Sequence, residues 1–147
     1  MFVVDTSVLV YAANVRAEEH RRCRALIERW RVQRGAWYLT WGICYEFLRV
    51  VTHPRVLQAP WTAGAALAFL AALRASPGLV VLTPTDRHAD VLAELEREVP
   101  LLQGNLWHDA ETACLMREHG VRVICTRDTD FHRFPHIESV DPLTDEP

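Results

Sequence analysis

The sequence predicts a three-layer α/β/α sandwich, in which helices cover both faces of a central, mainly parallel sheet. Short apolar runs such as "MFVV" and "LVVLTP" are typical of strands buried on both faces. Stretches with apolar residues at helical spacing separate these runs, and they are long enough to serve as crossovers between parallel strands. Such crossovers are right-handed, so we expect the helices to divide between the two faces of the sheet.

The first half of the chain alternates strand and helix signals. The first apolar run stops at "DTS", whose side chains favour the start of a helix. Gly35, Pro54 and the pair "PG" at 77–78 each follow a helical pattern and favour its end. The expected elements are a strand at 1–4, a short helix ending at Ala13, a helix at 17–33, a strand at 36–40, and helices at 41–54 and 62–78.

The second half continues the alternation. "LVVLTP" predicts a strand, and "VRVICT" predicts another after Gly120 closes a helix. A weak last strand is expected near "IESV". The expected elements are a strand at 79–84, helices at 85–99 and 108–120, and strands at 121–126 and about 137–140.

Length and composition favour one domain. Half of the 147 residues are hydrophobic, which is enough for a substantial core. No internal repeat or flexible linker divides the chain. We therefore expect residues 1–147 to form a single domain whose last few residues, in "DPLTDEP", are a flexible tail.

Composition also excludes several functions. All sixteen cationic residues are arginine, so no lysine is present for a Schiff base, an amine nucleophile or a phosphate loop. The net charge of −3 argues against a strongly basic nucleic-acid module, although a local basic rim would not change the total. The four cysteines lie in apolar runs without zinc-site spacing and are expected to be reduced core residues. The apolar N-terminus has no basic leader and is too short to span a bilayer, so no membrane association and a cytoplasmic location are expected.

Four carboxylates are expected at the same edge of the sheet. Asp5 follows the first strand and Asp128 follows the fourth. Glu46 lies one turn into the helix after the second strand, and Asp109 starts the helix that leads into the fourth. Because ligands of open parallel sheets bind outside the carboxyl ends of the strands, these four side chains are expected to converge in one crevice.

Converging carboxylates need a cation. At a few ångströms each pair repels by roughly several kcal/mol, even at an effective dielectric constant near 20. Nearby arginines could offset part of this, but Mg²⁺ or Mn²⁺ suits a carboxylate cluster without His or Cys ligands. One or two such ions can activate water and stabilise the leaving oxygen of a phosphodiester. Hydrolysis of nucleic acid is therefore the leading prediction.

Four segments carry a resemblance to a known family: "VVDTSVLV", "YEFLRVVTHPRV", "HDAETACLMREHG" and "TRDTDFHRFPHI" followed by "DPL". In this order the sequence resembles the PIN-domain nucleases, and among them the toxins of VapBC toxin–antitoxin modules, over nearly the whole chain. The resemblance implies a PIN-like fold and a ribonuclease that requires Mg²⁺ or Mn²⁺. It implies a catalytic quartet of Asp5, Glu46, Asp109 and Asp128, with Asp5 and Asp109 as direct metal ligands, Glu46 and Asp128 binding directly or through water, and Thr6 and Thr126 in support.

The resemblance also implies partners. Family members act on RNA as homodimers, and the toxins are held inactive by a small VapB-like antitoxin that covers the active site and often inserts an arginine. The hydroxyl residue Ser7 stands where many relatives carry Asn, which removes no carboxylate.

Each acid also has a purely structural explanation. Asp5 could cap a helix, Glu46 could pair with Arg49, and Asp109 could favour a helix N-terminus. Asp128 and Asp130 could shape a turn, and for Asp130 a turn and supporting role is preferred to metal contact. Other polar or aromatic residues could contact RNA but are more often solvated or in the core: His53, Arg55, His108, His132 and the five tryptophans, of which Trp41 and Trp107 are the better candidates for stacking.

Other functions remain open at this stage. A catalytically silent PIN-like module could dock a partner's arginine in the acidic pocket, although the four intact acids argue against lost catalysis. A PIN-like nuclease outside toxin–antitoxin systems, or one that cleaves DNA, would use the same metal chemistry. A phosphatase or phospho-receiver domain would also place an Asp after the first strand, but the phosphatase needs a DxD pair that is absent, and both commonly need a lysine.

Overall fold

Strand β1, residues Phe2–Val4, is the centre of a five-stranded sheet in the computed structural model, which describes residues 1–147. The strand order is β3-β2-β1-β4-β5, and every neighbouring pair is parallel. This confirms the predicted parallel sheet, including its weak last strand. The other strands are β2 (Trp37–Thr40), β3 (Leu79–Leu82), β4 (Val123–Cys125) and β5 (Glu138–Val140).

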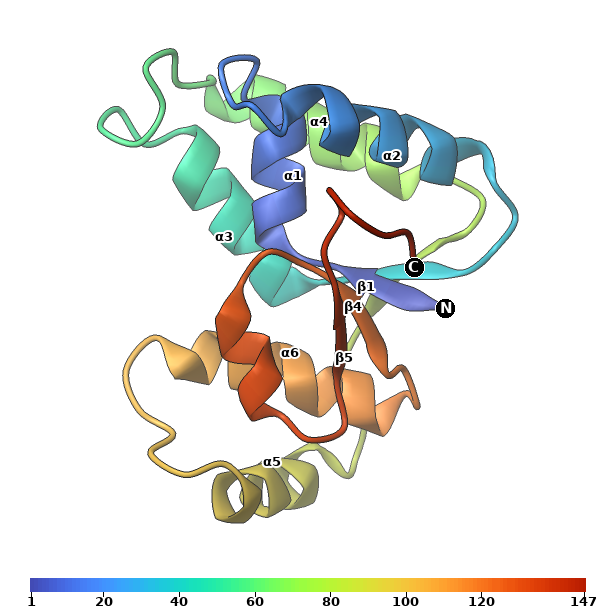
Figure 1. Cartoon of the computed structure of the whole chain (residues 1–147), viewed down its shortest axis with the longest axis vertical. Coiled ribbons are helices and arrows are strands. Elements are labelled where there is room, and N and C mark those ends of the chain that lie inside the picture. The colour runs from blue at the N-terminus through green and yellow to red at the C-terminus, as the bar shows by residue number, and fades with distance from the viewer.

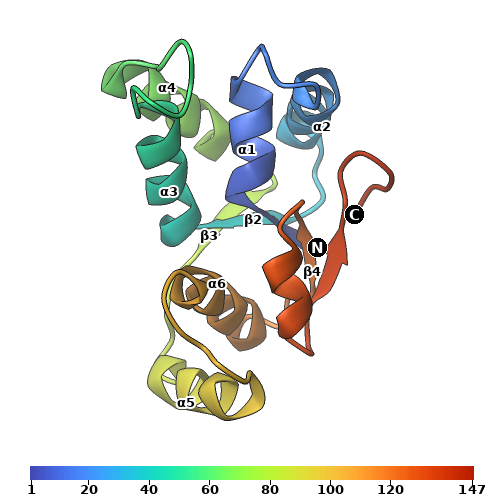
Figure 2. The same ribbon diagram turned by 60° about the vertical axis from the view of Figure 1, so that its left-hand side comes forward.

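Helices cover both faces of the sheet, which confirms the three-layer sandwich (Figures 1 and 2). Four helices lie on one face: α1 (Thr6–Ala13), α2 (His20–Val32), α3 (Trp41–Val51) and α4 (Ala63–Arg74). On the other face, α6 (Leu106–Glu118) lies beside the sheet and α5 (His88–Glu98) packs on the outer side of α6 (Figure 2).

Threonine caps fix the starts of two helices. Thr40 Oγ1 accepts a hydrogen bond of 3.1 Å from Ile43 N at the start of α3. Thr62 Oγ1 does the same for Ala65 N, at 3.2 Å, at the start of α4. Such caps satisfy backbone donors that the first turn of a helix leaves without partners. The cap at Thr40 lies at the end of β2, so it fixes where the helix that carries Glu46 begins.

Helix boundaries differ from the sequence prediction by a few residues. Helix α2 begins at His20 rather than at residue 17, and α3 ends at Val51, ahead of Pro54. Helix α6 begins at Leu106, two positions earlier than predicted, because Leu106 is buried and adds to the core. Asp109 therefore lies in the first turn of α6 rather than at its first residue. A short 3₁₀ helix at Thr129–Arg133 was not predicted; its Phe131 is buried in the core.

The buried hydrophobic side chains form one cluster of 36 residues. Trp30 and Trp37 belong to it, with ring centroids 6.1 Å apart, whereas Trp41 and Trp107 are 43% and 42% exposed. All four cysteines are buried and free, as predicted. None of the helices has the length and apolar character needed to cross a membrane.

Candidate active site

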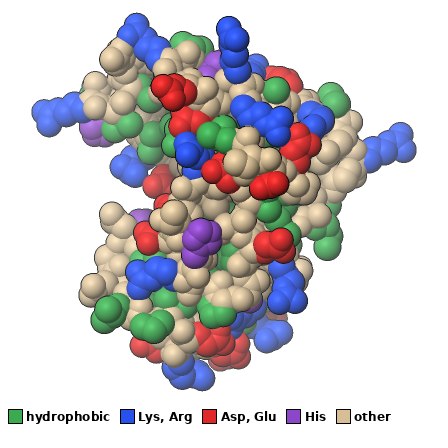
Figure 3. Space-filling view, viewed as in Figure 1, with side chains coloured by type: hydrophobic (Ala, Val, Ile, Leu, Met, Phe, Trp, Pro, Cys, Tyr) green, Lys and Arg blue, Asp and Glu red, His purple; other side chains and the backbone are tan.

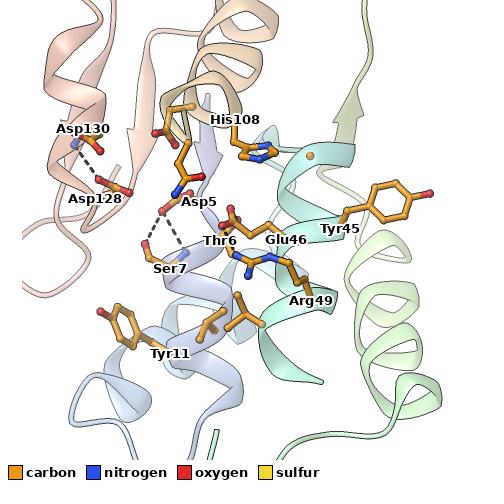
Figure 4. A pocket seen from close by; sticks show the side chains of 15 residues that line it. Asp5, Thr6, Ser7, Tyr11, Tyr45, Glu46, Arg49, His108, Asp128 and Asp130 are labelled. Carbon is orange, nitrogen blue, oxygen red and sulfur yellow. Dashed lines mark hydrogen bonds and ion pairs between the residues drawn. The ribbon is translucent and has the colours of Figure 1, made fainter. Parts of the chain in front are cut away.

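A cavity of about 730 Å³ lies at the carboxyl end of β1, between α1, α3 and the first turn of α6. All four predicted acids, Asp5, Glu46, Asp109 and Asp128, line this cavity, as does Asp130. Figure 3 shows acidic side chains around the hollow between the two helical layers. Figure 4 shows Asp5 before α1, Glu46 on α3, and Asp128 and Asp130 after β4 around one space. The parallel sheet thus brings together residues that are far apart in sequence.

Asp5 is held in place through one of its two carboxylate oxygens. Oδ2 accepts hydrogen bonds from Ser7 Oγ at 2.6 Å, Ser7 N at 3.2 Å and Thr126 Oγ1 at 2.7 Å (Figure 4 shows the two from Ser7). None of these three hydrogen bonds uses Oδ1, so this oxygen is available to a ligand. Asp5 is only 7% exposed, and burial raises its pKa more than these hydrogen bonds lower it. Asp5 caps α1 as well, so its structural and site roles coexist.

Asp109, Asp128 and Asp130 form the tightest group of acids. Each offers a carboxylate oxygen, and these oxygens lie within 4.8 Å of one another. Burial, followed by the charges of Asp128, Asp5, Asp130 and Glu46, raises the pKa of Asp109 to about 7. A cation among these oxygens would relieve the repulsion between them.

Glu46 faces the cavity from α3. Its Oε2 accepts a hydrogen bond of 3.1 Å from Thr6 Oγ1, and its Oε1 pairs with Arg49 Nη2 at 3.3 Å. The side chains of Glu46 and Arg49 are 42% and 65% exposed, so this pair contributes little to stability. Arg49 is the only arginine among the residues that line the cavity. It therefore supplies the one guanidinium that faces the acids.

Thr126 connects the two strand ends of the site. Its Oγ1 donates to Asp5 Oδ2 and accepts a hydrogen bond of 2.9 Å from Asp128 N. Asp128 Oδ1 in turn accepts from Asp130 N at 2.9 Å and caps the 3₁₀ helix (Figure 4). This is the turn predicted for "TRDTDF", and it brings carboxylate oxygens of Asp128 and Asp130 within 4.8 Å of one of Asp109.

Several residues line the cavity although the sequence predicted no role for them in the site. Ser7 is the most informative, since a hydroxyl two positions after an N-cap Asp is well placed to hold that carboxylate. His108 lines the cavity, whereas His53, Arg55 and His132 do not.

Neither Trp41 nor Trp107 lines the cavity. The Arg74 guanidinium lies over the Trp41 ring, 5.4 Å from the ring centroid. The other unpredicted lining residues are Val10, Tyr11, Gly42, Tyr45, Val50 and Asn105.

The donor set of the cavity fits a hard divalent cation. The converging groups are carboxylates, one of them with a free oxygen and one with a pKa raised by its acidic neighbours. Oxygen ligands of this kind suit Mg²⁺ and Mn²⁺ rather than a thiophilic metal. The fold and the cavity together define an α/β protein equipped for divalent-metal chemistry at the carboxyl edge of its sheet.

Comparison with known proteins identifies the family. The PIN domain model matches residues 2–137, and this chain belongs to the PIN-domain family. The chain is 32% identical to ribonuclease VapC48 of Mycobacterium tuberculosis over 140 residues, covering 95% of this chain and 96% of that protein. It is 31% identical to ribonuclease VapC37 of the same organism over 137 residues, covering 93% and 94% of the two chains.

Solved structures share the fold. The sarcin–ricin loop cleaving toxin VapC20 of Mycobacterium tuberculosis superposes with a TM-score of 0.62 at 22% identity, over 90% of this chain and 93% of that one. VapBC2 of Rickettsia felis, solved with a DNA fragment from its promoter, gives a TM-score of 0.61 at 16% identity, over 95% and 96%.

Proposed function

We propose that this protein is a metal-dependent endoribonuclease that acts as the toxin of a type II toxin–antitoxin system. The observation that carries the proposal is the convergence of Asp5, Glu46, Asp109 and Asp128 in one cavity. The relatives named ribonuclease VapC match this chain over nearly its whole length and support RNA as the substrate. A cytoplasmic location is part of the proposal, as is a single domain spanning residues 1–147 with one hydrophobic core.

The acids have distinct roles in the proposed site. Asp5 binds Mg²⁺ or Mn²⁺ directly through its free Oδ1, and Asp109 binds it from the first turn of α6. Glu46 and Asp128 bind directly or through water, and Asp130 supports Asp128 by donating its backbone N–H to Asp128 Oδ1. The bound cation supplies an activated water and stabilises negative charge on the phosphodiester oxygens.

The remaining polar residues position these acids and the substrate. Ser7 and Thr126 hold Asp5 Oδ2, whereas Thr6 holds Glu46 Oε2 and Arg49 pairs with Glu46 Oε1, so both carboxylates are fixed beside the cavity. Arg49 binds a phosphate of the RNA next to the cleaved bond, since its guanidinium is exposed and lies at the edge of the cavity. Such positioning lowers the barrier by holding the reacting groups in place before cleavage.

The proposal includes a small VapB-like antitoxin and a homodimer as partners. Two complexes with components of similar fold, FitAB and VapBC2, have been solved bound to DNA fragments. An antitoxin arginine inserted among the acids of this cavity would form a salt bridge with them and block the metal site. A catalytically silent module would keep this docking function alone, but the intact acids favour catalysis.

Cleavage of structured RNA by the purified protein tests the proposal. We expect cleavage with Mg²⁺ or Mn²⁺, none with EDTA, and loss of activity in an Asp5→Asn variant. A DNA oligonucleotide of the same sequence controls for the substrate class. Equal cleavage by the wild type and Asp5→Asn, or cleavage unaffected by EDTA, would contradict the mechanism.

A further inference from the structure

Three metal-binding side chains meet outside the cavity, between α5 and α6. His88 is the first residue of α5, and Cys114 and Glu118 lie one turn apart on the same face of α6. His88 Nδ1 is 2.6 Å from Glu118 Oε2 and 3.5 Å from Cys114 Sγ. Cys114 Sγ is 3.9 Å from the same Glu118 oxygen. The three ligand atoms therefore surround one point.

The cluster is buried on two sides and open on the third. Cys114 is fully buried and so is the side chain of Glu118, while 27% of the His88 side chain is exposed. Glu118 Oε1 accepts hydrogen bonds from the backbone N–H and the hydroxyl of Thr85, so only Oε2 faces His88 and the thiol. An ion would enter past His88 and meet three converging donors.

These donors have the chemistry and spacing of a zinc site. Zinc binds Cys sulfur, His nitrogen and Glu oxygen tetrahedrally, and its bond lengths place ligand atoms about 3.4–3.6 Å apart. The two distances to sulfur, 3.5 and 3.9 Å, are close to this spacing. The His88–Glu118 distance is shorter because a proton lies between them, and an ion would replace that proton. We propose that His88, Cys114 and Glu118 bind a Zn²⁺ ion, with water as the fourth ligand.

Binding changes the protonation of two groups. The thiol of Cys114 loses its proton to solvent and binds as a thiolate. The proton between His88 Nδ1 and Glu118 Oε2 is also released to solvent, with the other ring nitrogen of His88 keeping its own proton, so His88 binds as a neutral imidazole through Nδ1. Without metal the thiol keeps its proton, because burial and the charge of Glu118 raise the pKa of Cys114 to about 11. The carboxylate of Glu118 and the thiolate together then balance the charge of the ion.

This site is separate from the acidic cavity. Cys114 and Glu118 follow Asp109 by five and nine residues on α6, which is roughly 7.5 and 13.5 Å along the helix axis at 1.5 Å per residue. The donors also differ, since sulfur and nitrogen select zinc whereas the cavity offers carboxylate oxygens. A zinc ion here would join the start of α5 to α6. The loop before α5 already contacts the end of α6 through two hydrogen bonds, one from Thr85 N to Glu118 and one between His119 and the Thr83 carbonyl.

Cobalt substitution tests the site through a signal specific to sulfur. The metal-free full-length protein is titrated with Co²⁺ and the thiolate-to-cobalt charge-transfer absorption is recorded, followed by displacement with Zn²⁺. We expect one equivalent of Co²⁺ to produce this band and Zn²⁺ to abolish it. The band should be absent in Cys114→Ser but unchanged in Asp109→Asn and in Cys44→Ser, which removes another buried thiol outside the cluster.

His88→Ala gives a second variant in case Cys114→Ser does not fold, because the His88 side chain is partly exposed. It should weaken zinc binding by about tenfold or more, measured by competition with a chromogenic chelator. No charge-transfer band, or a band that persists in a folded Cys114→Ser, would overturn the proposal. Zinc binding that is lost in Asp109→Asn but kept in His88→Ala would also overturn it, because the ion would then lie in the acidic cavity.

Discussion

Thr126 Oγ1 lies 2.7 Å from Asp5 Oδ2, although 121 positions separate the two residues in sequence. Strands β1 and β4 are parallel neighbours with Val4 beside Cys125, so the residues that follow each strand meet at the carboxyl edge of the sheet. The same hydroxyl accepts a hydrogen bond from Asp128 N. One threonine therefore sets the position of two acids from different strands.

Replacing Thr126 by valine removes this hydroxyl with little change in shape. Asp5 loses one of the hydrogen bonds to Oδ2, so we expect metal-dependent RNA cleavage to fall by about 10–100-fold, as for other residues that orient metal ligands. Thr52→Val is the control, because the Thr52 hydroxyl donates to the Leu48 carbonyl away from the cavity. Equal activity of the two variants would show that Thr126 does not orient Asp5.

The pH dependence of stability reports on Asp109. Its pKa is about 7 in the folded, metal-free protein and 3.8 as the ordinary value, so the folded state holds this proton more tightly. The free energy of unfolding should therefore fall as the pH rises from about 4 to about 7, and the loss is complete above 7. Urea unfolding in EDTA at pH 5 and pH 8 measures this change, which should be smaller in Asp109→Asn. An unchanged pH dependence in the variant would contradict the raised pKa.

Gly78 is required by close backbone packing. A Cβ at this position would clash with the Gly35 carbonyl oxygen and lie 3.1 Å from that of Gln33, and neither backbone atom can move aside easily. We expect Gly78→Ala to lower the free energy of unfolding by about 1–3 kcal/mol. Gly64→Ala is the control, since a Cβ there meets nothing within 4 Å in helix α4, and it should raise stability by up to about 1 kcal/mol. Chemical denaturation measures both, and similar values for the two variants would exclude the packing argument.

Arg49 gives a test of substrate binding separate from metal binding. Arg49→Met should raise the KM for RNA while Mn²⁺ binding stays unchanged. The slope of the logarithm of the RNA-binding constant against log[salt] should fall by about one, as expected for the loss of one phosphate contact. Arg97→Met is the matched control, because Arg97 is exposed in the last turn of α5 and does not line the cavity. A lower kcat with unchanged KM and salt dependence would assign Arg49 to positioning Glu46 instead.

Much of this architecture could be predicted from the sequence because its signals are local. Buried strands such as "MFVV" and the helix-start residues "DTS" mark the elements, and parallel order places Asp5 and Asp128 at one edge. The hydrogen bond between Thr126 and Asp5 could not be predicted, since it depends on the register of β1 and β4. The same holds for His88 and Cys114, whose proximity depends on how α5 packs against α6.

Helix start positions were also hard to predict, because they depend on tertiary packing. The start of α6 depends on burial of Leu106 against the core, which no pattern in "GNLWHDA" reveals. The 3₁₀ helix after Asp128 depends on Phe131 reaching the core, which also brings Asp130 next to Asp109. Local sequence thus predicted which acids approach the site but not their final distances.

Two aspartates in equivalent positions provide the most direct test of the central claim. Asp90 and Asp109 each lie in the first turn of a helix, α5 and α6, but only Asp109 lines the acidic cavity. The measurement is the single-turnover rate of RNA cleavage with saturating Mn²⁺ for Asp109→Asn and Asp90→Asn. If the cavity is the catalytic metal site, Asp109→Asn loses cleavage by at least about a hundredfold and Asp90→Asn retains the wild-type rate. Equal rates for the two folded variants would contradict the claim, because Asp109 would then only stabilise the N-terminus of α6.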